Sequence, residues 1–256
     1  MTRKAGLITG GAARIGALIA QGLAQDGWRV AVHYNRSNAA AEKLCAKINK
    51  SGGSAMPIGG NLAIRQDVDS LISRAAKALE TPLTGLINNA STFSPDTAQK
   101  MDNASFDYHM DVNLRAPMML ARDFAAQYNG ADGVIINMID QRVLKPNPTY
   151  FSYTLAKTAL YGATKTLAQA LAPNIRVNGI GPGPTLQNVE QDEAMFSAEV
   201  QHTLLGRSSP PESILAGVRY LLGATSVTGQ MIAIDSGQHL TWRTKDILSA
   251  TPDGAI

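Results

Sequence analysis

The sequence has 256 residues, of which 45% are hydrophobic and 17% are charged, and its formal net charge is +3. This composition suffices for one core, and the weak charge without a Lys/Arg cluster argues against nucleic acid as a partner. The single cysteine, Cys45, excludes an internal disulfide, and no apolar run approaches the roughly 18 residues that span a bilayer, so we expect a cytoplasmic protein with no membrane partner.

Short apolar runs alternate along the chain with longer segments of helical periodicity. The predicted strands are residues 5–9, 29–34, 54–59, 85–89, 133–139, 175–180 and 231–235. The predicted helices are residues 15–26, 39–50, 66–79, 104–128, 152–171 and 212–222. Apolar strands that alternate with helices predict an α/β fold, in which a doubly wound parallel sheet of about seven strands is covered on both faces. We therefore predict one Rossmann-type catalytic domain over residues 1–256.

The segment 181–207 interrupts this alternation. It begins with GPGPTLQNVEQDE, which contains two prolines and mostly polar residues. A long connection of this kind in a compact domain is often functional, so we predict a substrate flap here.

The first predicted turn has the features of a phosphate site. The segment LITGGAARIG places Gly10, Gly11 and Gly16 between the first strand and the first helix. Glycines allow the backbone to approach a pyrophosphate, and the helix N-terminus offers it free N–H groups. A glycine-rich turn without a ligand is the alternative, but the strand–turn–helix context favours dinucleotide binding.

The end of the second strand indicates which dinucleotide is bound. An NAD site usually has an acidic residue there, whereas this chain has His33, Asn35, Arg36 and Ser37. Arginine and hydroxyl groups bind a 2′-phosphate through charge-assisted hydrogen bonds. We therefore predict NADPH as the cofactor. Two alternatives are that Arg36 is a solvated loop cation and that His33 is structural.

Several motifs in order resemble the short-chain dehydrogenase/reductase family. They are TGGAARIG, NNAS at 88–91, VN at 112–113, Tyr153-x-x-x-Lys157, GPG at 181–183 and VTGQMIAIDSG. Within the family the chain is most similar to pteridine reductases and bacterial dihydromonapterin (alternative dihydrofolate) reductases. That similarity rests on Arg14 in the glycine turn, the segment 33–37, Phe93 after NNAST, and Asp140 at the usual position of the catalytic serine.

The resemblance implies a set of site residues and a homotetramer, and no metal site. The implied cofactor contacts are Gly10, Arg14, Ile15, Gly16, His33, Tyr34, Asn35, Arg36, Ser37, Asn61, Leu62, Asn89, Ala90, Ser91, Tyr153, Lys157, Pro182 and Gly183. The implied substrate contacts are Arg14, Ser91, Phe93, Asp140 and Tyr153. Asn61 departs from the family, which usually has aspartate there, so we expect its amide oxygen to serve adenine in an altered form. Packing for Phe93 and a turn for Ser91 remain alternatives.

Tyr153 and Lys157 lie four residues apart and share one face of a predicted helix. A lysine cation beside a phenol favours the phenolate, so we expect Lys157 to lower the pKa of Tyr153. The resemblance adds a contact of Lys157 with the nicotinamide ribose and a water held by Asn113, which completes the predicted catalytic set of Asp140, Tyr153, Lys157 and Asn113.

Asp140 indicates the substrate. Ketone reduction needs a neutral donor to polarise the carbonyl, and a carboxylate there would repel the developing alkoxide. Reduction of a pterin C=N bond instead delivers a proton to a ring nitrogen, which a carboxyl group beside Tyr153 can assist. Asp140 as a turn cap after a strand is the alternative.

We therefore predict an NADPH-dependent reductase that converts a dihydropterin (dihydromonapterin, dihydrobiopterin or dihydrofolate) to its tetrahydro form. A carbonyl or 3-oxoacyl reductase is the second enzymatic interpretation. A non-catalytic NADPH sensor is the third, although it would not need Tyr153 and Lys157 together.

Overall fold

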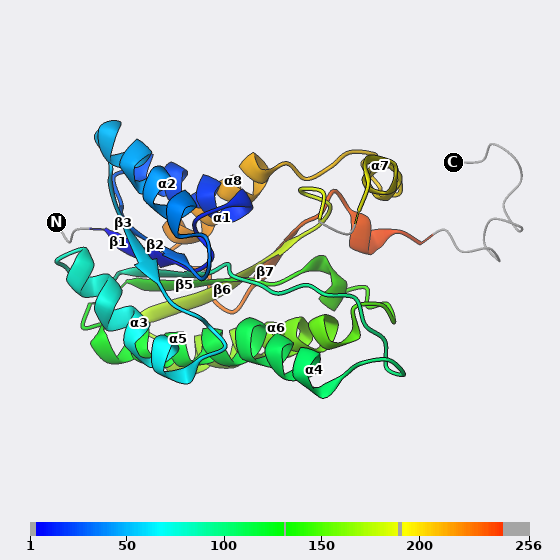
Figure 1. Cartoon of the computed structure of the whole chain (residues 1–256), viewed down its shortest axis with the longest axis horizontal. Coiled ribbons are helices and arrows are strands. Elements are labelled where there is room, and N and C mark those ends of the chain that lie inside the picture. Colours follow the sequence, from blue (N-terminus) through cyan, green and yellow to red (C-terminus); the bar gives the residue numbers. More distant parts are fainter. Residues whose placement is uncertain (1–3, 131, 189–190, 243–256) are drawn as a thin grey trace, which may run out of the picture.

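The computed structural model describes residues 4–130, 132–188 and 191–242, and within them one parallel sheet organises the chain (Figure 1). The strands run β3-β2-β1-β4-β5-β6-β7 across the sheet. Their bounds are β1 Ala5–Ile8, β2 Arg29–Tyr34, β3 Ser54–Gly59, β4 Gly85–Asn88, β5 Gly133–Met138, β6 Ile175–Pro182 and β7 Met231–Ile234. The predicted α/β fold with a seven-stranded doubly wound sheet is confirmed.

Helices cover both faces of the sheet, with α1, α2 and α8 on one side and α3, α4, α5 and α6 on the other (Figure 1). The α-helices are α1 Arg14–Gln25, α2 Asn38–Lys50, α3 Arg65–Ala78, α4 Asn103–Met110, α5 Ala116–Gln127, α6 Phe151–Leu171, α7 Glu193–Gln201 and α8 Pro211–Gly223. Among the residues described, none of the helices combines the length and apolarity that crossing a membrane requires.

The core forms two layers because the central strands are apolar on both faces. Every residue of β1 and β5 is buried. Leu71 of α3 and Phe124 of α5 pack on one face of the sheet, whereas Ile19 of α1 and Val218 of α8 pack on the other. Burial on both faces is typical of a parallel sheet and leaves its strand ends as the place for polar chemistry.

The predicted helix over residues 104–128 is wrong as a continuous α-helix. It is divided by a π-helical segment, η1 Asp111–Arg115, which contains Asn113. Pro117 lacks the N–H that an α-helix would direct at the carbonyl of Asn113, so the ladder is interrupted at this point.

The predicted flap contains an unexpected helix. Helix α7 lies at residues 193–201 and begins with Asp192, whose side chain accepts the N–H of Met195. Residues 189 and 190 of the predicted flap lie outside the described part of the chain. Only the helical content of the segment therefore changes, and its role as a flap stays a prediction.

The topology determines where a ligand site can form. The chain order reverses between β1 and β4, which are neighbours in the sheet. In open α/β sheets ligands bind at such a switch point, outside the carboxyl ends of the strands. The turn after β1, the end of β2 and the segments after β4 and β5 all meet at this edge.

Candidate active site

The turn between β1 and α1 is built so that only glycine fits at its critical positions. Gly10 has φ +60°, and a Cβ there would lie 2.9 Å from the Cα of Ala90. A Cβ on Gly16 would collide with the carbonyl oxygen of Gly10. Asn89 supports the turn by donating to the carbonyls of Thr9 at 2.9 Å and Gly10 at 3.1 Å. The result is a concave turn at the start of a helix, which is a site for an anion.

His33 links this turn to the neighbouring strands. Its Nδ1 accepts the N–H of Gly10 at 3.0 Å, and its Nε2 lies 3.0 Å from the carbonyl oxygen of Gly60. This pattern requires the tautomer with a proton on Nε2. Burial lowers the pKa of His33 to about 4, so the ring is neutral. The His33 side chain therefore has the structural role that was its alternative, and the residue also lines the cavity beside the turn.

Two adjoining hollows at the turn have the size of a dinucleotide's parts. One of about 390 Å³ contains Ile15, Asn61, Leu62 and Ser91 in its lining, together with the glycine turn. The other has a volume of about 460 Å³. Residues of the glycine turn line it together with residues at the end of β2, which include Tyr34, Asn35, Arg36 and Ser37. Predicted cofactor residues from four separate segments, at the ends of β1, β2, β3 and β4, are thus brought together.

Asn61 uses its amide oxygen within its own loop. The Oδ1 atom accepts the N–H of Ala63 at 3.0 Å, and the N–H of Asn61 donates to Asp67 Oδ2 at 2.7 Å. The oxygen expected to serve adenine therefore already has a backbone partner. Asn61 shapes the wall of the cavity next to Leu62.

Asp140 and Tyr153 form the chemical centre of the site. The Tyr153 hydroxyl donates to Asp140 Oδ2 at 2.7 Å, and Asp140 Oδ1 accepts the N–H of Arg142 at 2.7 Å. One oxygen of the carboxyl group therefore makes the turn-cap contact, and the other makes the contact with Tyr153 that the catalytic interpretation requires. Asp140 is partly exposed as a residue, but its carboxyl is surrounded by protein, and this burial raises its pKa.

The expectation of a lowered pKa for Tyr153 is wrong. Burial and the neighbouring Asp140 raise the pKa of Tyr153 well above its usual value. Lys157 is itself buried, which lowers its pKa to about 8, and its Nζ donates to the carbonyl of Met138 at 2.7 Å. The phenol is therefore kept protonated by its surroundings, in the state of a proton donor.

Asn113 holds the loop after β4 in place. Its Oδ1 accepts the Thr92 N–H at 2.9 Å and the Ser91 hydroxyl at 3.1 Å, and its Nδ2 donates to the Thr92 carbonyl at 2.9 Å. Ser91 accordingly has the turn role that was its alternative. These bonds use the Oδ1 atom and one of the two N–H groups of Nδ2, so the predicted water contact would use the second N–H group or the backbone of the π segment.

An aromatic cluster continues outward from Tyr153. Phe93 meets Tyr153 edge to face at 4.7 Å and stacks on Tyr150 at 4.0 Å with an interplanar angle of 5°. The guanidinium of Arg142 lies 5.2 Å from the Tyr150 ring centre and 5.8 Å from that of Phe93. The sequence motifs placed neither Tyr150 nor Arg142 in the site. The available signal was a cation two residues after Asp140.

Arg14 connects the glycine turn to the predicted flap. Its Nη2 donates to the carbonyls of Gln187 at 2.9 Å and Leu186 at 3.2 Å. Its backbone has φ 51°, which is unusual for a residue other than glycine. At the base of the same segment, Pro182 ends β6 and Gly183 packs against Asp235 so closely that a Cβ would lie 2.6 Å from its Cα.

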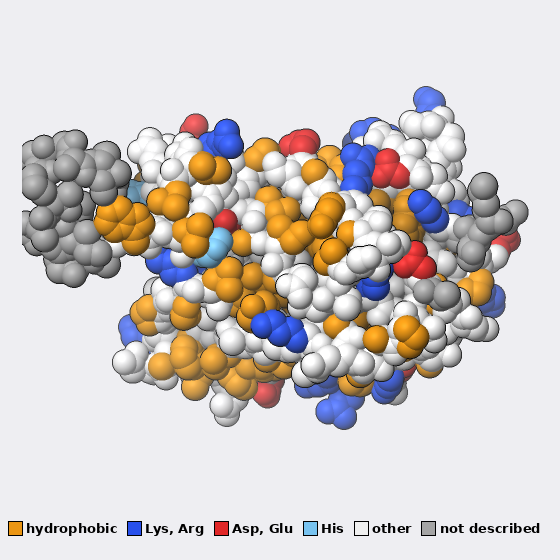
Figure 2. Space-filling model, turned by 180° about the vertical axis from the view of Figure 1, so that it is seen from behind, with side chains coloured by type: hydrophobic (Ala, Val, Ile, Leu, Met, Phe, Trp, Pro, Cys, Tyr) orange, Lys and Arg blue, Asp and Glu red, His pale blue; other side chains and the backbone are white. Residues whose placement is uncertain are grey.

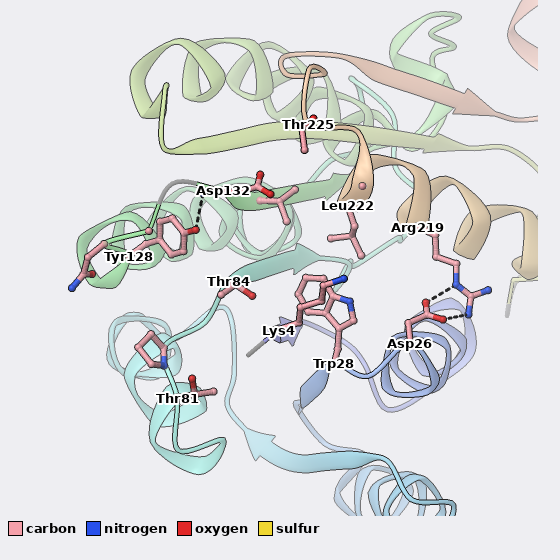
Figure 3. A pocket seen from close by; sticks show the side chains of 15 residues that line it. Lys4, Asp26, Trp28, Thr81, Thr84, Tyr128, Asp132, Arg219, Leu222 and Thr225 are labelled. Carbon is pink, nitrogen blue, oxygen red and sulfur yellow. Dashed lines mark hydrogen bonds and ion pairs between the residues drawn. The ribbon is translucent and has the colours of Figure 1, made fainter. Parts of the chain in front are cut away.

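A larger cavity, of about 880 Å³, lies elsewhere (Figure 3). Its lining includes Trp28, Thr84 and Asp132, which directly precede β2, β4 and β5, so it is at the amino ends of the strands. Lys4 stands over the Trp28 ring, and Arg219 pairs with Asp26. None of the Asp140, Tyr153 and Lys157 side chains lines it. Size alone therefore selects the wrong edge of the sheet, and the hydrogen-bonded titratable groups identify the reactive one.

The switch-point location, the glycine turn and the buried tyrosine–lysine pair define a Rossmann-type oxidoreductase. A family model described as "short chain dehydrogenase" matches residues 4–196. The chain belongs to the short-chain dehydrogenase family.

Several known proteins are similar over almost the whole chain. FolM alternative dihydrofolate reductase 1 from Brucella canis, whose crystal structure contains NADP, is 46% identical with a TM-score of 0.92, and the match covers 95% of this chain and 97% of that one. Pteridine reductase 1 from Leishmania tarentolae is 31% identical over 94% of this chain and 98% of that protein. A 3-oxoacyl-[acyl-carrier-protein] reductase from Synechocystis is 29% identical over 93% and 97%.

Proposed function

We propose that this protein is an NADPH-dependent reductase of a dihydropterin, which it converts to the tetrahydro form. The observation that carries the proposal is the 2.7 Å hydrogen bond between the Tyr153 hydroxyl and the Asp140 carboxyl in a buried site. The similarity to alternative dihydrofolate reductases that bind NADP, and to a pteridine reductase, supports the same substrate class.

The cofactor site fits NADPH. Gly10 and Gly16 leave a cradle that a Cβ would fill, beside the N-terminus of α1. Arg36 and Ser37 border the hollow at the end of β2, where a 2′-phosphate would be held. When bound, NADPH supplies the hydride.

Side chains of the protein donate the proton and replace it. Tyr153, whose raised pKa keeps it protonated, donates from its hydroxyl to the ring nitrogen. The Lys157 ammonium, with its Nζ 5.6 Å from the Tyr153 ring centre, stabilises the phenolate that remains. Asp140 has a raised pKa because it is buried, so its carboxyl can hold the proton that restores the phenol. Its protonated form is also free of the charge that would repel a phenolate.

The predicted organisation completes the proposal. We infer one catalytic domain with a flap over residues 181–207, acting as a homotetramer in the cytoplasm. Helices α5 and α6 lie on the same face of the sheet, where they are available to a second copy (Figure 1). On the face drawn in Figure 2, Lys and Arg side chains are scattered rather than gathered, which supports a small-molecule substrate over nucleic acid. Light scattering of the purified protein tests the tetramer.

Substrate turnover tests the function. NADPH oxidation should be seen with 7,8-dihydrofolate, 7,8-dihydrobiopterin and 7,8-dihydromonapterin. The variant Asp140→Ser should lose about 100-fold or more of this activity, the scale of general acid catalysis, while its NADPH affinity stays unchanged. Turnover of ketones or 3-oxoacyl thioesters alone would establish the carbonyl reductase alternative. Tight NADPH binding without any substrate, and without an effect of Tyr153→Phe, would establish the sensor.

A further inference from the structure

Arg142 stands at the outer edge of the reactive centre. Its backbone N–H donates to the carboxyl group of Asp140, and this hydrogen bond holds the Arg142 backbone beside the catalytic carboxyl. Its guanidinium lies against the stacked Phe93 and Tyr150 rings, and Phe93 in turn touches Tyr153. The cation is therefore separated from the catalytic phenol by one layer of aromatic side chains.

Hydrogen bonds orient the Arg142 guanidinium through Nη1 and leave the side with Nε and Nη2 for a ligand. Nη1 donates to Asn147 Oδ1 at 2.8 Å and to the carbonyl of Thr149 at 3.4 Å. In the part of the chain that the structure describes, Arg142 forms no ion pair, and its Nε and Nη2 donate no hydrogen bond. Nε and Nη2 form the side of a guanidinium that binds a carboxylate through two parallel hydrogen bonds.

The aromatic pair gives this cation a second property of a ligand site. The Phe93 and Tyr150 rings are nearly parallel and only partly buried. Flat, rigid rings beside an arginine favour a ligand in which a negatively charged group follows an aromatic group.

We propose that Arg142 binds a carboxylate on the side chain of the substrate, with an aryl group of that side chain lying along Phe93 and Tyr150. The inference rests on the proposed pteridine reductase function and narrows it. It selects pteridines with an aryl-carboxylate tail, of which dihydrofolate is the probe, over those with a short neutral tail, of which dihydrobiopterin is the probe.

The competing role is electrostatic adjustment of the centre. Burial raises the pKa of both Asp140 and Tyr153, and the charge of Arg142 opposes this by lowering both pKa values. A residue with that role alone would change the rate for every substrate alike, since Asp140 and Tyr153 serve all of them. A tail-binding residue changes KM only where the tail is charged.

The test compares three substrates that share the pterin ring: 7,8-dihydrofolate, its dimethyl ester and 7,8-dihydrobiopterin. Arg142→Gln should raise KM for dihydrofolate about tenfold, as expected for the loss of a charge-assisted bidentate contact at a partly exposed site. KM for the ester and for dihydrobiopterin should stay within about twofold, and the lost charge should change kcat by the same factor for all three. Lys145→Gln is the matched control, because Lys145 is a nearby rim cation whose Nζ already bonds to Thr241.

Three results would overturn the inference. They are an equal change of KM for the acid and its ester, a fall in kcat for all three substrates with KM for dihydrofolate unchanged, and the same effect from Lys145→Gln. In each of these cases pteridine reduction itself persists, and only the tail site fails. If the wild-type protein reduces none of the three substrates, the proposed function fails and this inference falls with it. Misfolding of the variant is checked by its NADPH affinity, which should equal that of wild type.

Discussion

At the scale of single residues, the site is a group of titratable side chains whose pKa values burial shifts toward the neutral forms. Burial raises the pKa of Asp140 and Tyr153 and lowers that of Lys157. Sequence reasoning considered the lysine beside the phenol and expected a lower pKa for Tyr153. It could not include desolvation, which depends on all the packed neighbours. The site therefore holds protons ready for transfer instead of a preformed phenolate.

Lys157 should make the cofactor-free protein more stable as the pH rises from 8 to 10.5. Burial lowers the pKa of Lys157 from 10.5 to about 8, so the unfolded chain binds a proton in this window that the folded protein does not. Stability then increases with pH, and the linked free energy is about 3 kcal/mol. Denaturant unfolding of wild type and Lys157→Met across this range measures it. The free energy of unfolding of wild type should rise relative to that of Lys157→Met as the pH increases from 8 to 10.5, because other groups titrate equally in both proteins.

A constant difference between the two proteins over this pH range would contradict a depressed pKa for Lys157. The lost hydrogen bond to the Met138 carbonyl does not interfere, since it adds an offset that does not depend on pH.

At the scale of elements, the strands and most helices follow from the sequence, because their apolar periodicity reflects local patterns. The division of residues 104–128 was indicated only by Pro117, and helix α7 was masked by the polar composition of the flap. Contacts between distant segments could not be predicted. Tyr150 reaches Phe93 with a left-handed backbone at φ 54°, which no sequence pattern announces. The motifs thus located Asp140, Tyr153 and Lys157, whereas their electrostatic state and the aromatic rim required coordinates.

Arg14 should restrain the predicted flap. It donates to the carbonyls of Leu186 and Gln187, and two hydrogen bonds of ordinary strength correspond to about a tenfold difference in opening. Arg14→Ala should therefore raise the rate of proteolytic cleavage within residues 181–207 about tenfold in the cofactor-free protein. Cleavage sites and rates are read by mass spectrometry.

Arg14→Gly separates the side chain from the backbone. Glycine relieves the left-handed conformation at φ 51°, yet it loses the same two bonds. Both variants should show faster cleavage if the guanidinium restrains the flap. Wild-type cleavage rates in Arg14→Gly, with faster cleavage in Arg14→Ala alone, would place the effect in backbone strain instead.

At the scale of the whole molecule, the cofactor should act as a stabilising ligand. A ligand at 100 times its Kd adds about 2.7 kcal/mol to stability. NADPH should therefore raise Tm more than NADH at equal concentration, since only NADPH carries a 2′-phosphate, the group that we propose Arg36 binds in the hollow it lines. Arg36→Asp should reverse this order, because the acid repels the phosphate and can bind the ribose hydroxyls. Differential scanning fluorimetry measures it, and Lys50→Asp, the same charge change at the far end of α2, should keep the wild-type order.

The folded state as a whole should lose stability in acid through His33. This ring joins the glycine turn after β1, the end of β2 and the end of β3, through its contacts with Gly10 and Gly60. Burial lowers its pKa from 6.5 to about 4, so the unfolded chain binds a proton that the folded protein excludes. Stability is thus complete above pH 6.5 and is lost as the pH falls toward 4, by about 3 kcal/mol at the limit.

His33→Gln keeps a donor and an acceptor but cannot titrate, so its stability should fall less over this range in urea unfolding. His202→Gln, at an exposed position of the same residue type, should retain the wild-type acid profile. Parallel acid profiles for wild type and His33→Gln would show that the neutral ring at this junction does not limit the acid stability of the fold.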